Sequence, residues 1–441
     1  MNLAVVIPTR NRADLAATAL RSVLEARRPD VAVLVSDNST SVSERDRLRA
    51  HCEQHLTDRV LYVTPPHPLP MAEHWEWARR TATSVFEPTH LTLVTDRMIL
   101  ADGALHELAG LISRYPDRVV VYKLDVVHDF IHPVRLTQTP WTGRLLELDS
   151  AAILELSSSG EPGPYLPQML NCVTPMSVLK AVEARFGAVF GSLSPDVCFG
   201  YRCLAACNSI LLYDKSLLIH YATDRSNAAS VGRGQHSADA ADFHKLAGEA
   251  LNSATPEPRF ATVVNGVLHE YCLVREESQD RRFPPLSRHG YLAAIAREVG
   301  RMENAGLRGE MKSLLRAHGW RGRARIRNAM ERAIRLIRYV ARHPDAGREL
   351  VHLQLVDRPY GTRAGVALRR LGLNPRARRE PRFDTPMKAI AYARRHPRPR
   401  SSAVWSLAGL EQIPGAIRQL PAEATAPTGR YAKKSTIPAH M

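Results

Sequence analysis

Two short apolar runs near the start of the chain, joined by a helical segment, constrain the fold most strongly. Residues 3–7 read LAVVI, residues 31–35 read VAVLV, and polar residues follow each run. Between them, residues 15–24 place apolar side chains at helical spacing. A strand, a helix and a second strand within about forty residues form a βαβ unit, whose strands are parallel neighbours in one sheet.

The polar residues after these two runs are expected to meet at one edge of the sheet. Pro8 should end the first strand, because proline cannot donate to a sheet ladder. Thr9 and Arg10 follow it, and Asp37 and Asn38 follow the second strand. Ligands of parallel sheets bind beyond the carboxyl ends of the strands. These residues are therefore predicted to border one crevice.

Strands and helices continue to alternate as far as about residue 125. Further strands are predicted at residues 60–63, 91–94 and 119–124, and helices at 71–83 and 104–114. Later in the chain, helices are expected at 170–184 and 197–207, and short strands at 210–213 and 217–220. This alternation predicts an α/β fold in which helices flank a sheet.

The opening stretches LAVVIPTRNR and VAVLVSDNST resemble the nucleotide pocket of family 2 glycosyltransferases with the GT-A fold. The resemblance implies a Rossmann-like mixed sheet and a nucleotide-diphosphate sugar as the donor substrate. It also implies that the donor contacts a group of residues at the strand ends, namely Pro8, Thr9, Arg12, Asp37, Asn38, Asp96 and Arg97. The first strand is not followed by G-x-G-x-x-G, which makes a dinucleotide-binding domain the weaker interpretation.

Asp96 follows the predicted fourth strand, where the family carries an Asp-x-Asp or Asp-Asp pair that holds Mg²⁺ or Mn²⁺. This chain has Thr95-Asp96-Arg97-Met98, with one carboxylate and one arginine. One carboxylate can still hold a divalent ion together with the diphosphate and water. Alternatively, Arg97 supplies the positive charge, because a guanidinium binds phosphate in a bidentate manner, or Asp96 only caps a turn.

His220 and Asp196 are the other two candidate site residues. The resemblance places His220 where GT-A enzymes often add a histidine to the metal, although a lone histidine beside an apolar run is more often structural. It places Asp196 as the general base of an inverting transfer, in Ser194-Pro195-Asp196 with Arg202 further along the helix. Serine, proline and aspartate also make an ordinary helix start, and the two roles are compatible.

Positive charge is concentrated in the last third of the chain. The whole chain has a net charge of +16, whereas residues 301–441 contain 30 Lys and Arg against 10 Asp and Glu. A helix at 326–341 is predicted to carry an apolar face with arginines mostly off it; that face comprises Ile326, Met330, Ile334, Ile337 and Ala341. Binding to an anionic membrane surface, or a solvated helical appendage, would explain this concentration of positive charge. Nucleic acid is the least favoured partner, because aromatic side chains for stacking are sparse.

The chain length predicts more than one domain. We expect a GT-A-like domain at 1–240, a helical region at 241–345 and a basic region at 346–441 with a disordered tail from 421. Without a signal peptide or an apolar run of bilayer length, the protein is expected to be cytoplasmic, peripheral at the inner membrane face if the basic region binds lipid. The six cysteines are expected to be reduced thiols.

Transfer of a sugar to a hydroxyl of a carbohydrate or lipid-linked acceptor, in glycan or glycolipid synthesis, is the predicted function. The reduced metal motif leaves open an alternative: a GT-A-like nucleotide-sugar-binding or scaffold protein without turnover. A nucleotidyltransferase would need a glycine- and lysine-rich phosphate loop after the first strand, and Thr9-Arg10-Asn11-Arg12 is not one.

Overall fold

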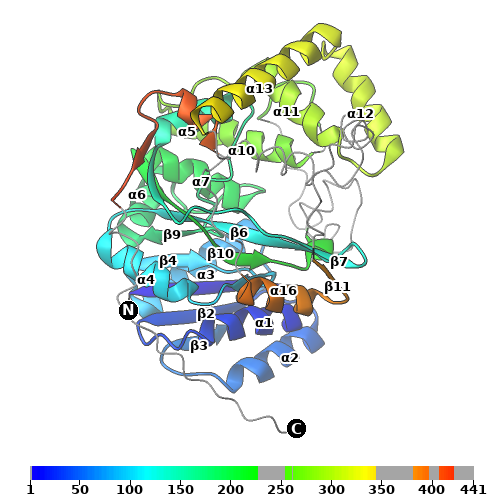
Figure 1. Cartoon of the computed structure of the whole chain (residues 1–441). Coiled ribbons are helices and arrows are strands. Elements are labelled where there is room, and N and C mark those ends of the chain that lie inside the picture. Colours follow the sequence, from blue (N-terminus) through cyan, green and yellow to red (C-terminus); the bar gives the residue numbers. More distant parts are fainter. Residues whose placement is uncertain (1, 227–253, 261, 344–380, 397–406, 422–441) are drawn as a thin grey trace.

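The computed structural model describes residues 2–226, 254–260, 262–343, 381–396 and 407–421, and these contain a mixed sheet of twelve strands (Figure 1). The main path through the sheet has the order β12-β8-β10-β6-β9-β4-β1-β2-β3. Its strands are β1 (Leu3–Thr9), β2 (Val31–Asp37), β3 (Val60–Val63), β4 (His90–Leu93), β6 (Val120–His128), β8 (Leu145–Asp149), β9 (Cys172–Pro175), β10 (Ser209–His220) and β12 (Ile417–Gln419). Beside this path lie β5 (Met98–Leu100), β7 (Val134–Thr137) and β11 (Arg382–Phe383).

The predicted βαβ unit is present, with α1 (Ala13–Leu24) connecting β1 to β2. β1 pairs in parallel with β2 on one side and with β4 on the other. The prediction that Pro8 ends the first strand is wrong, because β1 continues to Thr9, which lies opposite Asp37. The pairing of β1 with β4 stops at Val6. Beyond that point only β2 pairs with β1, so the proline interrupts no ladder on the β4 side.

Helices cover both faces of the sheet because the strands alternate their apolar side chains. In β1, Ala4 and Val6 join one core cluster while Val5 and Ile7 join the other. The first cluster is covered by α3 (Met71–Phe86), α5 (Ser150–Ser158), α6 (Met176–Phe186) and α7 (Pro195–Ala206), and the second by α1 and α4 (Ala104–Arg114). Helix α2 (Val42–Glu53) packs beside α1 and β3. The predicted mixed sheet flanked by helices is confirmed.

At two places the structure divides the chain into elements differently from the prediction. The apolar segment expected to be a helix from residue 170 first forms β9 and only then α6. The two short strands expected at 210–213 and 217–220 are one strand, β10, which changes register against β6 between Tyr213 and Leu218. These register shifts let an irregular strand keep its pairing across the polar residues between the two apolar runs.

A helical layer follows the sheet and lies on the opposite side of it from α1 and α2 (Figure 1). It contains α10 (Val263–Ser278), α11 (Arg288–Val299), α12 (Ala305–Ala317) and α13 (Gly322–Arg342). Tyr271 of α10 packs edge-on against Tyr201 of α7, with ring centroids 5.3 Å apart. The layer is therefore joined to the helices that cover the sheet.

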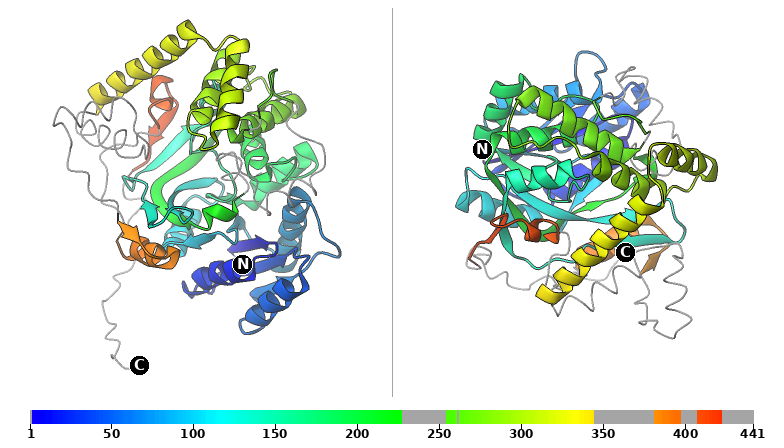
Figure 2. Two further views of the ribbon diagram at one scale, coloured as in Figure 1. Left: turned by 90° about the vertical axis from the view of Figure 1, so that its right-hand side faces the viewer. Right: turned by 90° about the horizontal axis from the view of Figure 1, so that it is seen from above.

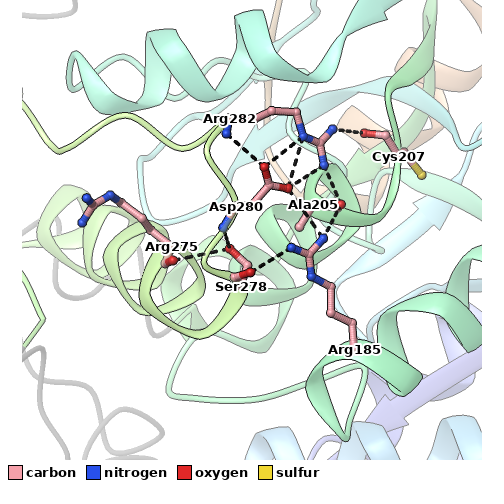
Figure 3. A network of polar contacts seen from close by, with 7 residues as sticks. All are labelled: Arg185, Ala205, Cys207, Arg275, Ser278, Asp280 and Arg282. Atoms are coloured by element: carbon pink, nitrogen blue, oxygen red, sulfur yellow. Dashed lines mark hydrogen bonds and ion pairs between the residues drawn. The ribbon is translucent and has the colours of Figure 1, made fainter.

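The residues after α10 also hold the end of α7 (Figure 3). Arg282 donates hydrogen bonds to the carbonyl oxygens of Ala205 and Cys207, at 2.6 and 2.9 Å. Arg185 of α6 donates to the Ala205 carbonyl as well, at 2.8 Å, and Asp280 accepts from Arg282. The last carbonyl groups of a helix have no partner within the helix, and here guanidinium groups satisfy them.

Segments near the C-terminus complete the sheet. β12 pairs antiparallel with β8, and β11 pairs antiparallel with β7. Helix α16 (Pro386–Arg395) is fixed by Arg394, which contacts Glu25 at 2.7 Å and Asp102 at 2.5 Å. Leu407 and Leu410 join the core cluster beneath α5. Most of the predicted disordered tail lies outside the described residues, and the predicted division into three domains stays a prediction.

We expect Leu410→Ala to destabilise the whole fold. Leu410 is 0% exposed, and truncating a buried leucine costs about 2–5 kcal/mol through lost burial and the cavity left behind. Urea unfolding should therefore show one transition at lower denaturant. Leu56→Ala is the matched control, because Leu56 is 45% exposed, and its effect should stay below about 0.5 kcal/mol. An unchanged midpoint for Leu410→Ala would show that the C-terminal segment is not part of the cooperative core.

Candidate functional site

The carboxyl ends of β1 and β4 bring together four of the residues singled out from the sequence. Thr9 Oγ1 donates to Asp96 Oδ2 at 2.9 Å. Arg12 Nη1 lies 3.5 Å from Asp96 Oδ1, and Arg97 Nε lies 4.0 Å from the same oxygen. Asp96 is 3% exposed. One buried carboxylate is thus shared between two guanidinium groups and a hydroxyl.

Arg97 also contacts His220 at the end of β10. Arg97 Nη1 donates to His220 Nε2 at 2.8 Å, so that nitrogen is the acceptor and the ring is neutral. Burial, followed by the charge of Arg97, lowers the pKa of His220 to about 3. Burial also lowers the pKa of Arg97, while Asp96 is the strongest of the groups that raise it. Arginine stays charged under these conditions.

Asp196 lies in the first turn of α7 and interacts electrostatically with Arg97. Burial raises the pKa of Asp196, whereas the backbone N–H groups of Val197 and Asp196 itself, and the charge of Arg97, lower it. The side chain of Ser194, at the N-cap, makes no capping hydrogen bond. The carboxylate of Asp196 therefore interacts with the first backbone N–H groups of α7 and with the charge of Arg97.

Asp37 and Asn38 lie on the neighbouring strand end, where they bind other parts of the protein. Asp37 is 1% exposed and accepts from the Tyr62 hydroxyl at 2.8 Å and from the Ser39 N–H at 2.9 Å. The Asn38 N–H donates to the carbonyl oxygen of Thr9 at 2.9 Å, and its side chain exchanges two hydrogen bonds with the backbone of Leu69. These bonds fix the loop after β3 against the end of β1.

The polar loop after β10 reaches the same cluster. Arg12 Nη2 donates to the carbonyl oxygen of Arg225 at 2.9 Å, and Arg225 Nη2 donates to the carbonyl oxygen of Asn11 at 3.3 Å. Residues 227–253, which follow in the sequence, lie outside the described residues. The described start of the loop therefore forms one border of the cluster around Asp96.

Two buried glutamates that the sequence analysis did not single out position the start of α7. Glu76 of α3 accepts from the N–H groups of Val189 and Phe190, both at 3.1 Å. Glu270 of α10 is 0% exposed and accepts from the Ser194 N–H at 2.9 Å. Burial raises the pKa of Glu270 to about 7, and the charge of Asp196 raises it further. The only sequence signal for Glu270 is a charged residue within an otherwise apolar helix face.

The residues expected to bind a metal do not fit that role in this arrangement. Asp96 and His220, the two candidate ligands, both contact the guanidinium of Arg97. No group of three or more His, Cys, Asp or Glu side chains suited to a metal ion occurs among the described residues. Mg²⁺ and Mn²⁺ prefer several oxygen ligands, and here a side-chain cation lies against the single carboxylate.

No protein-family model matches the sequence, and no curated protein matches it. Among solved structures, the chain is similar to TarS of S. aureus. The crystal structure of TarS 1–349 in complex with UDP-GlcNAc aligns with a TM-score of 0.39 and 14% identity over 68% of this chain and 82% of that one. A crystal structure of TarS aligns with a TM-score of 0.38 and 16% identity, over 74% and 54%. Similarity at this level does not assign a family.

We expect Glu270→Gln to become more stable, relative to the wild type, as the pH rises. The pKa of Glu270 is about 7 in the folded protein against 4.5 for the free group. The unfolded chain therefore ionises first, and the wild type loses stability as the pH rises between these values. Glutamine keeps an oxygen acceptor for Ser194 and does not titrate.

Thermal and urea unfolding from about pH 5 to about pH 8 should show the variant gaining up to about 3 kcal/mol on the wild type. Glu276→Gln on the same helix is the control, because Glu276 is exposed; its stability should follow the wild type throughout. A stability difference for Glu270→Gln that does not change with pH would contradict the raised pKa.

Proposed function

We propose that the protein is a glycosyltransferase that moves a sugar from a nucleotide-diphosphate donor to an acceptor hydroxyl, with inversion at the sugar. The observation that carries the proposal is the cluster in which Arg12 and Arg97 share Asp96 at the carboxyl ends of β1 and β4. The charge of Arg97 acts on the carboxylate of Asp196 and lowers its pKa, against the larger effect of burial. The opening stretches that resemble family 2 glycosyltransferases lie at this same edge of the sheet.

Arg12 and Arg97 act on the diphosphate. Guanidinium groups bind phosphate oxygens and stabilise the negative charge that develops as a nucleoside diphosphate leaves. Asp96 balances the two arginines and fixes their positions, with Thr9 holding its second oxygen. Pro8, Asp37 and Asn38 shape the wall of the nucleoside pocket.

Asp196 acts as the general base. Burial raises its pKa, against the opposing effects of the Val197 and Asp196 N–H groups and of the Arg97 charge, which makes its carboxylate a better proton acceptor for a hydroxyl group. An inverting displacement needs one base aligned opposite the leaving group. The helix start is a rigid support, because Glu270 and Glu76 bind the segment that leads into it.

Arginine rather than a metal supplies the positive charge in this proposal. Arg97 contacts both candidate ligands, Asp96 and His220. A Mg²⁺ or Mn²⁺ ion on the same residues is the competing hypothesis, and it requires Arg97 to move. The acceptor is a carbohydrate or lipid-linked glycan. The alternative function, a nucleotide-sugar-binding scaffold without turnover, retains donor binding and lacks transfer.

Donor binding tests the pocket and the role of Arg97. Calorimetry with UDP, GDP, dTDP, CDP and their common sugar conjugates should show micromolar binding of one nucleotide, with the same affinity in Mn²⁺ and in EDTA. Arg97→Gln should weaken it at least tenfold, as expected for loss of a charged phosphate contact. Arg59→Gln is the control, since Arg59 pairs with Asp58 at the surface.

Binding that disappears in EDTA would favour the metal hypothesis. Failure of all four nucleotides and their sugar conjugates to bind would contradict the enzyme and the scaffold alike.

Transfer separates the enzyme from the scaffold. Asp196→Asn should lower kcat by about 10²–10⁴-fold and leave the donor Kd unchanged, because the change removes the base and keeps the shape of the side chain. In the wild type, kcat should fall as the pH decreases through the raised pKa of Asp196. Asp58→Asn is the control at an exposed position. Equal transfer by the wild type and Asp196→Asn would overturn the assignment of the base.

A further inference from the structure

Helix α13 exposes its apolar face to solvent. Large hydrophobic side chains on this face are Ile326, Met330, Ile334 and Ile337, which are 61%, 59%, 45% and 67% exposed. They recur at spacings of three and four residues, so they form one stripe along a helix of 21 residues, about 30 Å long. A surface helix of a globular protein normally turns such a stripe toward the core.

The opposite, polar face of α13 is the one that contacts the protein. Arg335 pairs with Glu161, and Tyr339 is 2% exposed. Arg342, the last residue of the helix, donates to the carbonyl oxygen of Glu411 at 2.8 Å, and His343 just beyond it contacts the Glu411 carboxylate at 3.0 Å. These contacts fix the rotation of the helix. The outward direction of the apolar stripe therefore follows from the fold.

The helix carries strong positive charge beside the stripe. Its sequence contains seven arginines and a single acidic residue, Glu331, which pairs with Arg327 at 2.8 Å. Arg323, Arg325 and Arg338 lie at exposed positions. An exposed aliphatic stripe with flanking arginines is the arrangement of a helix that lies in the interface of an anionic bilayer.

We propose that α13 docks the protein on an anionic lipid surface, with Ile326, Met330 and Ile337 inserted among the lipids and the arginines at the headgroups. The helix forms one border of the molecule, on the far side from α1 and α2 (Figures 1 and 2). It can therefore meet a flat surface. Among the described residues, no helix has the length and apolar content to cross a bilayer, so α13 lies on the surface rather than spanning it.

Charge and side-chain type together favour lipid over the other possible occupants of this face. Two copies of α13 packed face to face would bring fourteen arginines together. The chain segment that follows the helix, residues 344–380, has eight arginines and four acidic residues, so it too is repelled. Single-stranded nucleic acid is bound by exposed aromatic side chains that stack on its bases, whereas this stripe is aliphatic.

Vesicle binding tests the proposal with the full chain. We expect co-sedimentation with vesicles of phosphatidylcholine and phosphatidylglycerol in equal parts, weaker binding in high salt, and none to phosphatidylcholine alone. Ile326→Ser with Ile337→Ser should lower vesicle affinity at least tenfold. Arg323→Gln with Arg338→Gln should lower it by about fivefold for each arginine removed.

Val42→Ser with Val85→Ser is the matched control, because these side chains are 67% and 53% exposed on other helices. It should bind vesicles as the wild type does, and circular dichroism should show that every variant is folded. The proposal is overturned if the wild type does not co-sediment with anionic vesicles, or if the Ile326→Ser, Ile337→Ser variant binds them as tightly as the wild type. It is also overturned if that variant only converts a dimer to a monomer in light scattering, or if RNA binds better than lipid.

Discussion

The charge of Arg97, whose side chain is 17% exposed, is the constraint on which the site depends. A guanidinium that is largely removed from water requires hydrogen-bond acceptors and an opposite charge. Asp96 provides the charge and His220 the acceptor, so the ends of β4 and β10 must meet. Because Asp96 also binds Thr9 and Arg12, the end of β1 is held at the same point. A nucleotide diphosphate entering this cluster would meet positive charge that is already in place, without waiting for side chains to reorganise.

The helical layer contributes to this site by helping to fix helix α7. The start of α7 is held by Glu76 and Glu270, and the end of α7 by Arg185 and Arg282. These four residues come from α3, α6, α10 and the segment after α10. A helix fixed at both ends keeps the first-turn carboxylate of Asp196 in one position relative to the strand ends. The layer beyond the sheet therefore contributes to the geometry of the site.

The early elements could be predicted from the sequence, because β1, β2 and β4 are apolar runs with polar ends and α1 has a clear helical period. Residues 172–175 could not be identified as a strand, since they lead into α6 without a change of composition. The same limit applies to Glu270. Its partner Ser194 lies 76 residues away, so the pairing exists only after α10 has packed on α7. Likewise, β12 has only three residues, and their sequence alone does not indicate a strand. They form one because they pair with the edge of β8.

That short strand is synthesised long after β8, the strand with which it pairs. Glu147 of β8 meets Arg418 of β12 across 271 residues of sequence. At about 5–20 residues per second, a ribosome needs roughly 15–55 s to make the intervening chain. During this interval the outer edge of β8 presents unpaired backbone groups to its surroundings. A polypeptide released before residue 417 would keep that edge open to pairing with other chains, so β12 protects the finished fold against edge-to-edge association.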